Sequence, residues 1–148
     1  MLTGPRRGPL AQGAALAVRL ITAAGLGIDA YVHLTLAPTY AEGGGQINEG
    51  VLFRGEAVLA VFSALVIIFA ARRISFLLGF AVSASALAIM LLSRYVDIGA
   101  LGPLPDLYDP VWFPAKLLAA FSEGAASIAA LTGIFLTSGH GNRDGSPP

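Results

Sequence analysis

One segment limits the fold of this chain more than any other: from Ile74 to Ser93 it carries no charged side chain. A helix rises about 1.5 Å per residue, so about 20 apolar residues cross the roughly 30 Å hydrocarbon core of a bilayer. Three further apolar stretches reach a similar length. The predicted spans are residues 14–38, 51–71, 74–95 and 112–137. Because these runs do not alternate apolar and polar side chains as barrel strands do, we predict four transmembrane helices.

The composition agrees with a membrane protein and excludes several function classes. Of the 148 residues, 55% are hydrophobic and 12% are charged, whereas soluble domains carry about 25% charged residues. Nine Lys and Arg balance nine Asp and Glu, so the chain has no basic field for nucleic acid. It also has no cysteine, which excludes disulfides, thiolate metal sites and cysteine nucleophiles. The lipid bilayer is therefore its first predicted partner.

The connections between the apolar stretches predict how the helices are arranged. The short link at Arg72–Arg73 makes neighbouring helices antiparallel, so we predict an all-α, up-down-up-down four-helix bundle. Val51–Ser63 aligns without gaps on Val111–Glu123, which indicates two pseudo-repeated hairpins related by an axis along the membrane normal. Residues 1–13 and 138–148 are predicted to be a disordered head and a disordered tail.

The distribution of basic residues predicts the orientation in the membrane. Lys and Arg near the helix ends concentrate before the first helix, in the second connection and in the tail, as Arg6, Arg7, Arg19, Arg72, Arg73 and Arg143. The first and third connections carry acidic residues instead. The positive-inside rule then places both termini in the cytoplasm.

Ionisable side chains inside the predicted helices point to a site, because they are costly in a membrane. Counted from the outer helix ends, one group lies roughly 5–9 Å deep and a second group roughly 13–16 Å deep. Both groups belong to a predicted polar well that opens outward. The candidate ligand-binding residues are Arg94, His33, Glu56 and Lys116 in the shallow group and Asp29 and Glu123 in the deep group.

Helical spacing predicts which of these side chains meet. Asp29 and His33 are four residues apart and share one helix face. Glu56 lies on the inward stripe of its helix, and we expect it to pair with Lys116 at the same depth. Arg54 lies on the other side of that helix and is expected to extend outward.

Three interpretations of the well remain open from the sequence. Its charges could form ion pairs that fix the helix register in a protein acting through partner contacts. The well could instead bind a small molecule or a lipid headgroup. The third interpretation is acid–base catalysis, with His33 as a base oriented by Asp29 and with Glu123 and Glu56 as further candidate catalytic residues.

No cofactor or metal is predicted. A single histidine within the helices argues against bis-histidine haem. The acidic residues and His33 could form a metal-binding set, but Arg54, Arg94 and Lys116 are expected nearby and would repel the ion. The oligomeric state stays open.

Three short segments carry a resemblance to a known family. They are RLITAAGLG in the first helix, RGEAVLAVFSALVIIFAARR in the second, and FPAKLLAAFSE at the start of the fourth. The pattern resembles DoxX-like proteins and, more generally, small four-helix membrane proteins of high-GC actinobacteria. The resemblance implies a bacterial inner-membrane location, an accessory role and a family carboxylate at Glu56.

The sequence thus favours a small integral membrane protein that acts as a binding or accessory subunit for a lipid, quinone or protein partner. The alternative is a small transmembrane enzyme of the isomerase or cyclase type, performing acid–base chemistry on a lipophilic substrate.

The predicted orientation can be tested by thiol labelling, because the natural chain has no cysteine. Cysteine introduced by Gly44→Cys should react with an impermeant thiol reagent in intact cells, whereas cysteine from Gly141→Cys should react only after lysis. The reverse pattern would contradict the positive-inside assignment.

Overall fold

The computed structural model describes residues 8–41 and 47–138 of the chain. The predicted disorder of residues 1–7 and 139–148 lies outside this described part. Within it the chain forms four long α-helices, and each is long and apolar enough to cross a membrane. The protein is therefore a small multi-pass integral membrane protein, as the sequence predicts.

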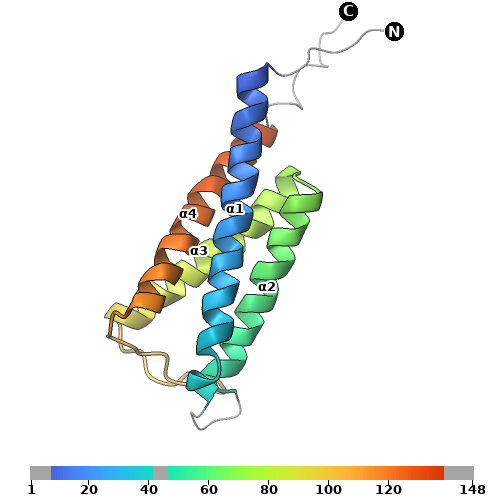
Figure 1. Cartoon of the computed structure of the whole chain (residues 1–148). Helices are drawn as coiled ribbons and strands as arrows, with labels where there is room; N and C mark the ends of the chain where they lie inside the picture. Colours follow the sequence, from blue (N-terminus) through green and yellow to red (C-terminus); the bar gives the residue numbers. More distant parts are fainter. Residues whose placement is uncertain (1–7, 42–46, 139–148) are drawn as a thin grey trace, which may run out of the picture.

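The helices follow one another in an antiparallel order (Figure 1). Their bounds are α1 Pro9–Leu36, α2 Glu49–Phe69, α3 Arg73–Tyr95 and α4 Pro114–Ser138, with a short 3₁₀ turn η1 at Thr39–Ala41. The predicted up-down-up-down four-helix bundle is confirmed. The duplication of the two hairpins stays a prediction.

Helix starts explain the small differences from the predicted spans. α1 begins at Pro9, five residues before the predicted start at Ala14, because proline suits the first helical position, where no backbone donor is needed. Residues 9–13 therefore belong to the helix and not to a disordered head. α2 begins two residues before its predicted start, because the Asn48 side chain caps it by accepting a 3.0 Å hydrogen bond from the Val51 N–H.

The packing between helices is uneven. α1 packs extensively on both α2 and α4, and α3 packs extensively on α4, whereas the contact between α2 and α3 is much smaller. α2 and α3 meet at the Arg72 turn and diverge toward the opposite end (Figure 1). We call that opposite end the loop end, because α1 passes to α2 and α3 passes to α4 there.

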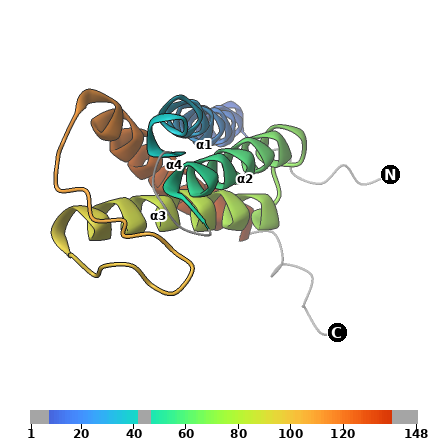
Figure 2. The ribbon, with the colours of Figure 1, turned by 90° about the horizontal axis from the view of Figure 1, so that it is seen from below.

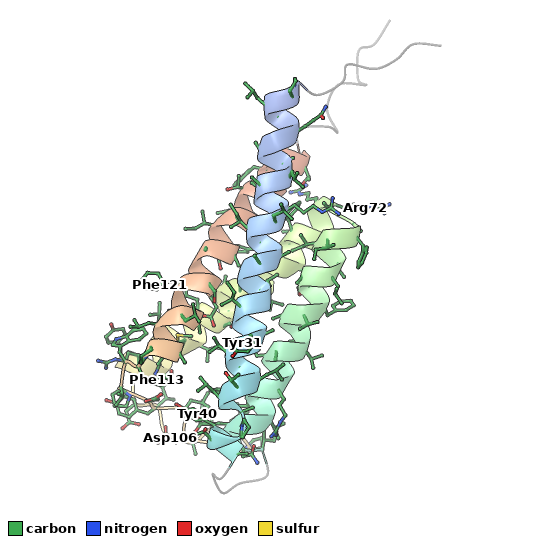
Figure 3. The ribbon with its side chains drawn as sticks, viewed as in Figure 1. Tyr31, Tyr40, Arg72, Asp106, Phe113 and Phe121 are labelled. Carbon is green, nitrogen blue, oxygen red and sulfur yellow. The ribbon has the colours of Figure 1, made fainter. Side chains whose placement is uncertain are left out.

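The connection between α3 and α4 runs across the loop end (Figure 2). It makes a tight turn in which the Leu101 and Leu104 backbones exchange hydrogen bonds of 3.2 and 3.0 Å. Gly102 inside this turn has φ +59°, a conformation that glycine adopts without steric cost. Figure 3 shows Tyr40, Asp106 and Phe113 gathered at this end and Arg72 at the other.

A glycine sets the distance between α1 and α4. A Cβ atom on Gly25 would lie 2.8 Å from the Ser122 carbonyl oxygen and 2.9 Å from the Ala126 Cβ. Gly25 therefore lets the two backbones approach closely, as small residues do in membrane bundles. Asp29 follows one turn later on the same face of α1, and Glu123 follows Ser122 on α4. The close approach consequently brings these two carboxyl groups together.

This contact predicts a difference between two glycines of α1. Gly25→Ala should lower the free energy of unfolding by about 1–3 kcal/mol, because overpacking forces the helices apart. Gly27→Ala is the matched control, since a Cβ there meets nothing within 4 Å. It should be neutral or stabilising by up to about 1 kcal/mol, because alanine is the better helix former. Thermal unfolding of both variants in the same detergent checks the contact, and equal stabilities would contradict it.

Candidate functional site

A cavity of about 600 Å³ lies at the loop end, between α2 and α3. Its volume falls within the range of small-molecule binding pockets, roughly 300–1,000 Å³. Side chains from all four helices and from the α3–α4 connection line it. The cavity occupies the region where α2 and α3 diverge, which explains why their mutual contact is small.

Most of the cavity wall is apolar. The aliphatic and thioether side chains on it include Leu36, Leu52, Leu59, Ile89 and Met90. Polar groups occur in two places. His33 and Glu56 are presented from within the helices, and Tyr40, Glu49, Asp109 and Lys116 lie nearer to the loops. The cavity therefore fits an amphipathic molecule that is largely hydrocarbon.

Asp109 organises the loop side of the cavity. Its Oδ2 accepts a 3.1 Å hydrogen bond from the Tyr40 hydroxyl and lies 3.0 Å from the Lys116 ammonium nitrogen. Lys116 also donates a 2.6 Å hydrogen bond to the Asp109 carbonyl oxygen, and the Asp109 N–H donates to the Ser93 carbonyl oxygen at 3.0 Å. One residue of the α3–α4 connection is thus tied to η1, α3 and α4.

The ionisation of this network follows from its contacts. Partial burial alone would raise the pKa of Asp109, but hydrogen bonds from Lys116 and the Val111 N–H and the Lys116 charge lower it below its ordinary value. Burial and the Asp109 charge raise the pKa of Tyr40 to about 12. Tyr40 therefore stays a hydrogen-bond donor and Asp109 stays an acceptor at neutral pH.

The prediction that Glu56 forms an ion pair with Lys116 is wrong. Both side chains line the cavity, but Lys116 binds Asp109, and Glu56 Oε1 is buried without a hydrogen-bond partner. Lys116 instead contacts Asp109 of the α3–α4 connection, because Asp109 provides two acceptors, its carboxylate and its carbonyl oxygen. The predicted inward position of Glu56 is confirmed, and Arg54 is exposed as predicted.

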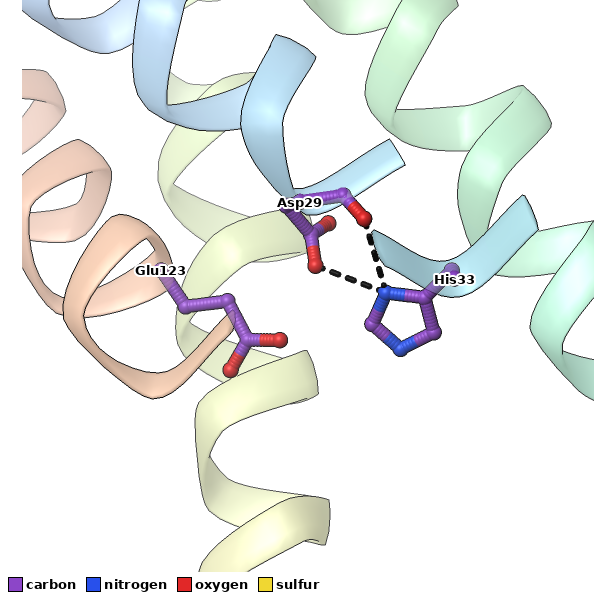
Figure 4. Close-up of side chains that lie close together, drawn as sticks. All are labelled: Asp29, His33 and Glu123. Atoms are coloured by element: carbon purple, nitrogen blue, oxygen red, sulfur yellow. Dashed lines mark hydrogen bonds and ion pairs between the residues drawn. The ribbon is translucent and has the colours of Figure 1, made fainter. Parts of the chain in front are cut away.

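A second group of ionisable side chains lies deeper, between α1 and α4 (Figure 4). His33 Nδ1 lies 2.8 Å from Asp29 Oδ1 and 3.1 Å from the Asp29 carbonyl oxygen. The Glu123 carboxylate faces this pair, and one ligand atom from each of the three residues lies within 4.8 Å of the other two. We call Asp29, His33 and Glu123 the buried cluster. The predicted pairing of Asp29 with His33 is confirmed.

The carboxylates of the buried cluster are removed from solvent and have few hydrogen-bonding contacts. Asp29 and Glu123 are both 0% exposed. The two oxygens of each lack a partner with hydrogen-bond geometry, although His33 lies close to Asp29. Buried charges normally pair, take up protons or coordinate metals. Three kinds of compensation fit this cluster: the His33 ring, which lies 2.8 Å from Asp29, a proton held between the two carboxyl groups, and a bound metal ion.

The cations expected near the cluster point elsewhere. Lys116 binds Asp109, and Arg54 is exposed. Arg19, which was not expected near the cluster, donates a 3.1 Å hydrogen bond to the Ile67 carbonyl oxygen. The Arg94 guanidinium lies 5.1 Å from the centre of the Tyr95 ring, and Arg94 is not among the residues that line the cavity. Over residues 8–41 and 47–138, no Lys or Arg forms an ion pair with Asp29 or Glu123.

His33 connects the buried cluster to the cavity. Its ring packs edge-on against Phe53 with ring centres 5.1 Å apart, and Phe53 in turn contacts Tyr40 at 4.8 Å. His33 lines the cavity, whereas Asp29 and Glu123 lie behind it. Sequence reasoning missed the roles of Asp109, Tyr40 and Phe53. A sequence signal that could have indicated an ordered loop over the cavity is the presence of three prolines in the α3–α4 connection, Pro103, Pro105 and Pro110.

Comparison with known proteins adds no family assignment: no family model, curated protein or solved structure matches the chain. The resemblance to DoxX-like proteins stays a prediction.

The geometry predicts which residue is coupled to Lys116. In a double-mutant cycle, Lys116→Met and Asp109→Asn should show a coupling free energy of about 1 kcal/mol. Either substitution alone already breaks the partly exposed, charged hydrogen bond between the two side chains, so the second one costs less. Lys116→Met and Glu56→Gln should be additive.

The coupling to Asp109 should be complete above the ordinary carboxyl pKa of 3.8 and decline as the pH falls below it, because the folded-state pKa is the lower one. Unfolding of the variants at several pH values measures this, and coupling to Glu56 alone would overturn the assignment.

Proposed function

We propose that this membrane protein binds a lipophilic small molecule with a polar end, in the cavity between α2 and α3. The observation that carries this proposal is the cavity itself: about 600 Å³, apolar along most of its wall, with His33 and Glu56 inside it. A cavity of that kind buries a hydrocarbon chain and orients one polar group.

The polar groups define the class of ligand. Imidazole and carboxyl groups donate or accept hydrogen bonds according to their protonation, which suits a carbonyl or hydroxyl group such as that of a quinone or an isoprenoid alcohol. Lys116 is held by Asp109, so the cavity offers no free cation among the described residues for a phosphate. We therefore favour a neutral polar end over a phospholipid headgroup.

The position of the cavity supports access from the bilayer. Both α2 and α3 contribute to its wall, and both helices expose apolar side chains such as Leu59 and Ile89 on the same region. A lipophilic ligand that enters between these helices never has to leave the hydrocarbon phase. The Asp109 network covers the loop end.

In the cell, we place the protein in a bacterial inner membrane with both termini cytoplasmic, acting as a binding or accessory subunit. The positive-inside distribution of Lys and Arg and the resemblance to DoxX-like proteins support this placement. A membrane protein partner that receives the ligand is part of the same proposal.

Acid–base chemistry is the second candidate, and one observation favours it. Asp29 fixes the His33 ring through Nδ1 at 2.8 Å, which orients a histidine for proton transfer at its other nitrogen. Glu56 lines the same cavity and supplies a second proton-transfer group. Recovery of a chemically altered molecule after incubation with the protein would distinguish this candidate from simple binding.

Ligand retention tests the proposed function. Protein purified in mild detergent should release a lipophilic molecule on solvent extraction, detected by liquid chromatography and mass spectrometry. Ala86→Phe should remove most of it, because Ala86 lines the cavity and the larger side chain fills it.

Ala88→Phe is the matched control, because Ala88 lies on the same helix and is exposed. It should leave retention unchanged, and thermal unfolding confirms that both variants fold. Equal amounts of ligand in the two variants, or none in the unmodified protein, would contradict the proposal.

A further inference from the structure

We propose that the buried cluster of Asp29, His33 and Glu123 binds a divalent transition-metal ion. The proposal goes beyond the lipophilic cavity and does not depend on it. It rests on two independent observations, the convergence of three ligand-type side chains and the fully buried Glu123 carboxylate, whose two oxygens both lack a hydrogen-bond partner.

The charge balance favours a divalent ion. As metal ligands, two carboxylates and a neutral imidazole would together carry a charge of −2 in a region where Asp29 and Glu123 are fully buried. A dication makes the cluster neutral, which removes most of the cost of keeping charge in a low-dielectric interior. The described Lys and Arg residues cannot supply this compensation, because none pairs with either carboxylate.

The types of donor atom indicate the kind of metal. Imidazole nitrogen suits zinc and iron, and carboxylate oxygen suits harder ions such as manganese. A mixed set of one nitrogen and two oxygen ligands selects Zn²⁺, Fe²⁺ or Mn²⁺ over Ca²⁺ or Cu⁺. Three protein ligands also leave at least one coordination position open, as metal sites with exchangeable ligands do.

The geometry is compatible with a shared ion. Ligands on one such metal at about 2.0–2.2 Å lie roughly 3 Å apart. His33 Nδ1 and Asp29 Oδ1 are already 2.8 Å apart, a distance at which the ion would replace the proton that joins them, and all three ligand atoms fall within 4.8 Å. The Glu123 side chain has to close the remaining distance, and its carboxylate already faces the pair (Figure 4).

The site would also explain the close approach of α1 and α4. Gly25 and Ser122 bring the two backbones together next to Asp29 and Glu123. A metal ion bound by both carboxylates would then join α1 to α4 at this contact.

Metal binding can be measured on the full chain, purified with a tag that contains no histidine. After chelator treatment and dialysis, titration with Co²⁺ should give visible absorption bands that saturate at about one ion per chain, and Zn²⁺ should abolish them. Asp29→Asn and Glu123→Gln should each weaken Co²⁺ binding by more than about 100-fold, since even outer-shell changes cost 10–100-fold.

Asp97→Asn is the matched control, because Asp97 is an exposed carboxylate outside the helices. It should leave the Co²⁺ titration unchanged. If a cluster variant fails to fold, spin-echo spectroscopy of bound Cu²⁺ in the unmodified protein should still show one imidazole nitrogen.

Two results would overturn the proposal. One is the absence of saturable Co²⁺ binding, which would mean that protons neutralise the carboxylates. The other is equal binding by the cluster variants and Asp97→Asn, which would place the metal elsewhere. Neither result affects the ligand-retention test, because that test uses residues of the cavity wall.

Discussion

The enclosure of two carboxyl groups in an apolar bundle is the constraint on which the rest of this structure depends. Removing a carboxylate from water is expensive unless a proton, a counter-charge or a metal compensates it. Asp29 and Glu123 are both fully buried and face each other across the α1–α4 contact. Gly25 makes that contact close, and His33 links it to the cavity. Ionisable side chains inside a membrane bundle are costly and often mark functional sites, which is why the cluster is the basis of the proposed metal site.

A second electrostatic interaction, at the loop end, engages Lys116 with Asp109 and not with the buried cluster. Asp109 holds Lys116 through a carboxylate and a carbonyl oxygen and holds Tyr40 through a hydroxyl. The ammonium group is thereby neutralised at the loop side of the cavity, and the α3–α4 connection is fixed over it. The Lys116–Asp109 pair at the loop end is therefore separate from the buried cluster, and the apolar cavity lies beside both.

The sequence was sufficient to predict the membrane class, the four helices and the inward positions of Asp29, His33, Glu56 and Glu123, because each follows from hydropathy and helical spacing. The sequence did not predict the partner of Lys116, because the depth of a residue along its helix does not reveal which loop residues fold next to it. Asp109 is seven residues from Lys116 and separated from it by the start of α4, so only the folded connection brings them together. The same limit applies to the cations that the sequence places near the buried cluster, because the directions of Lys116 and Arg94 depend on partners such as Asp109 and Tyr95.

Cryo-electron microscopy of the protein purified with its native lipids tests the central claim of a ligand-binding membrane bundle most directly. We expect elongated density between α2 and α3, with its polar end within hydrogen-bond distance of His33 or Glu56. A bundle in which α2 and α3 close on each other, with side chains filling the 600 Å³ cavity, would contradict it.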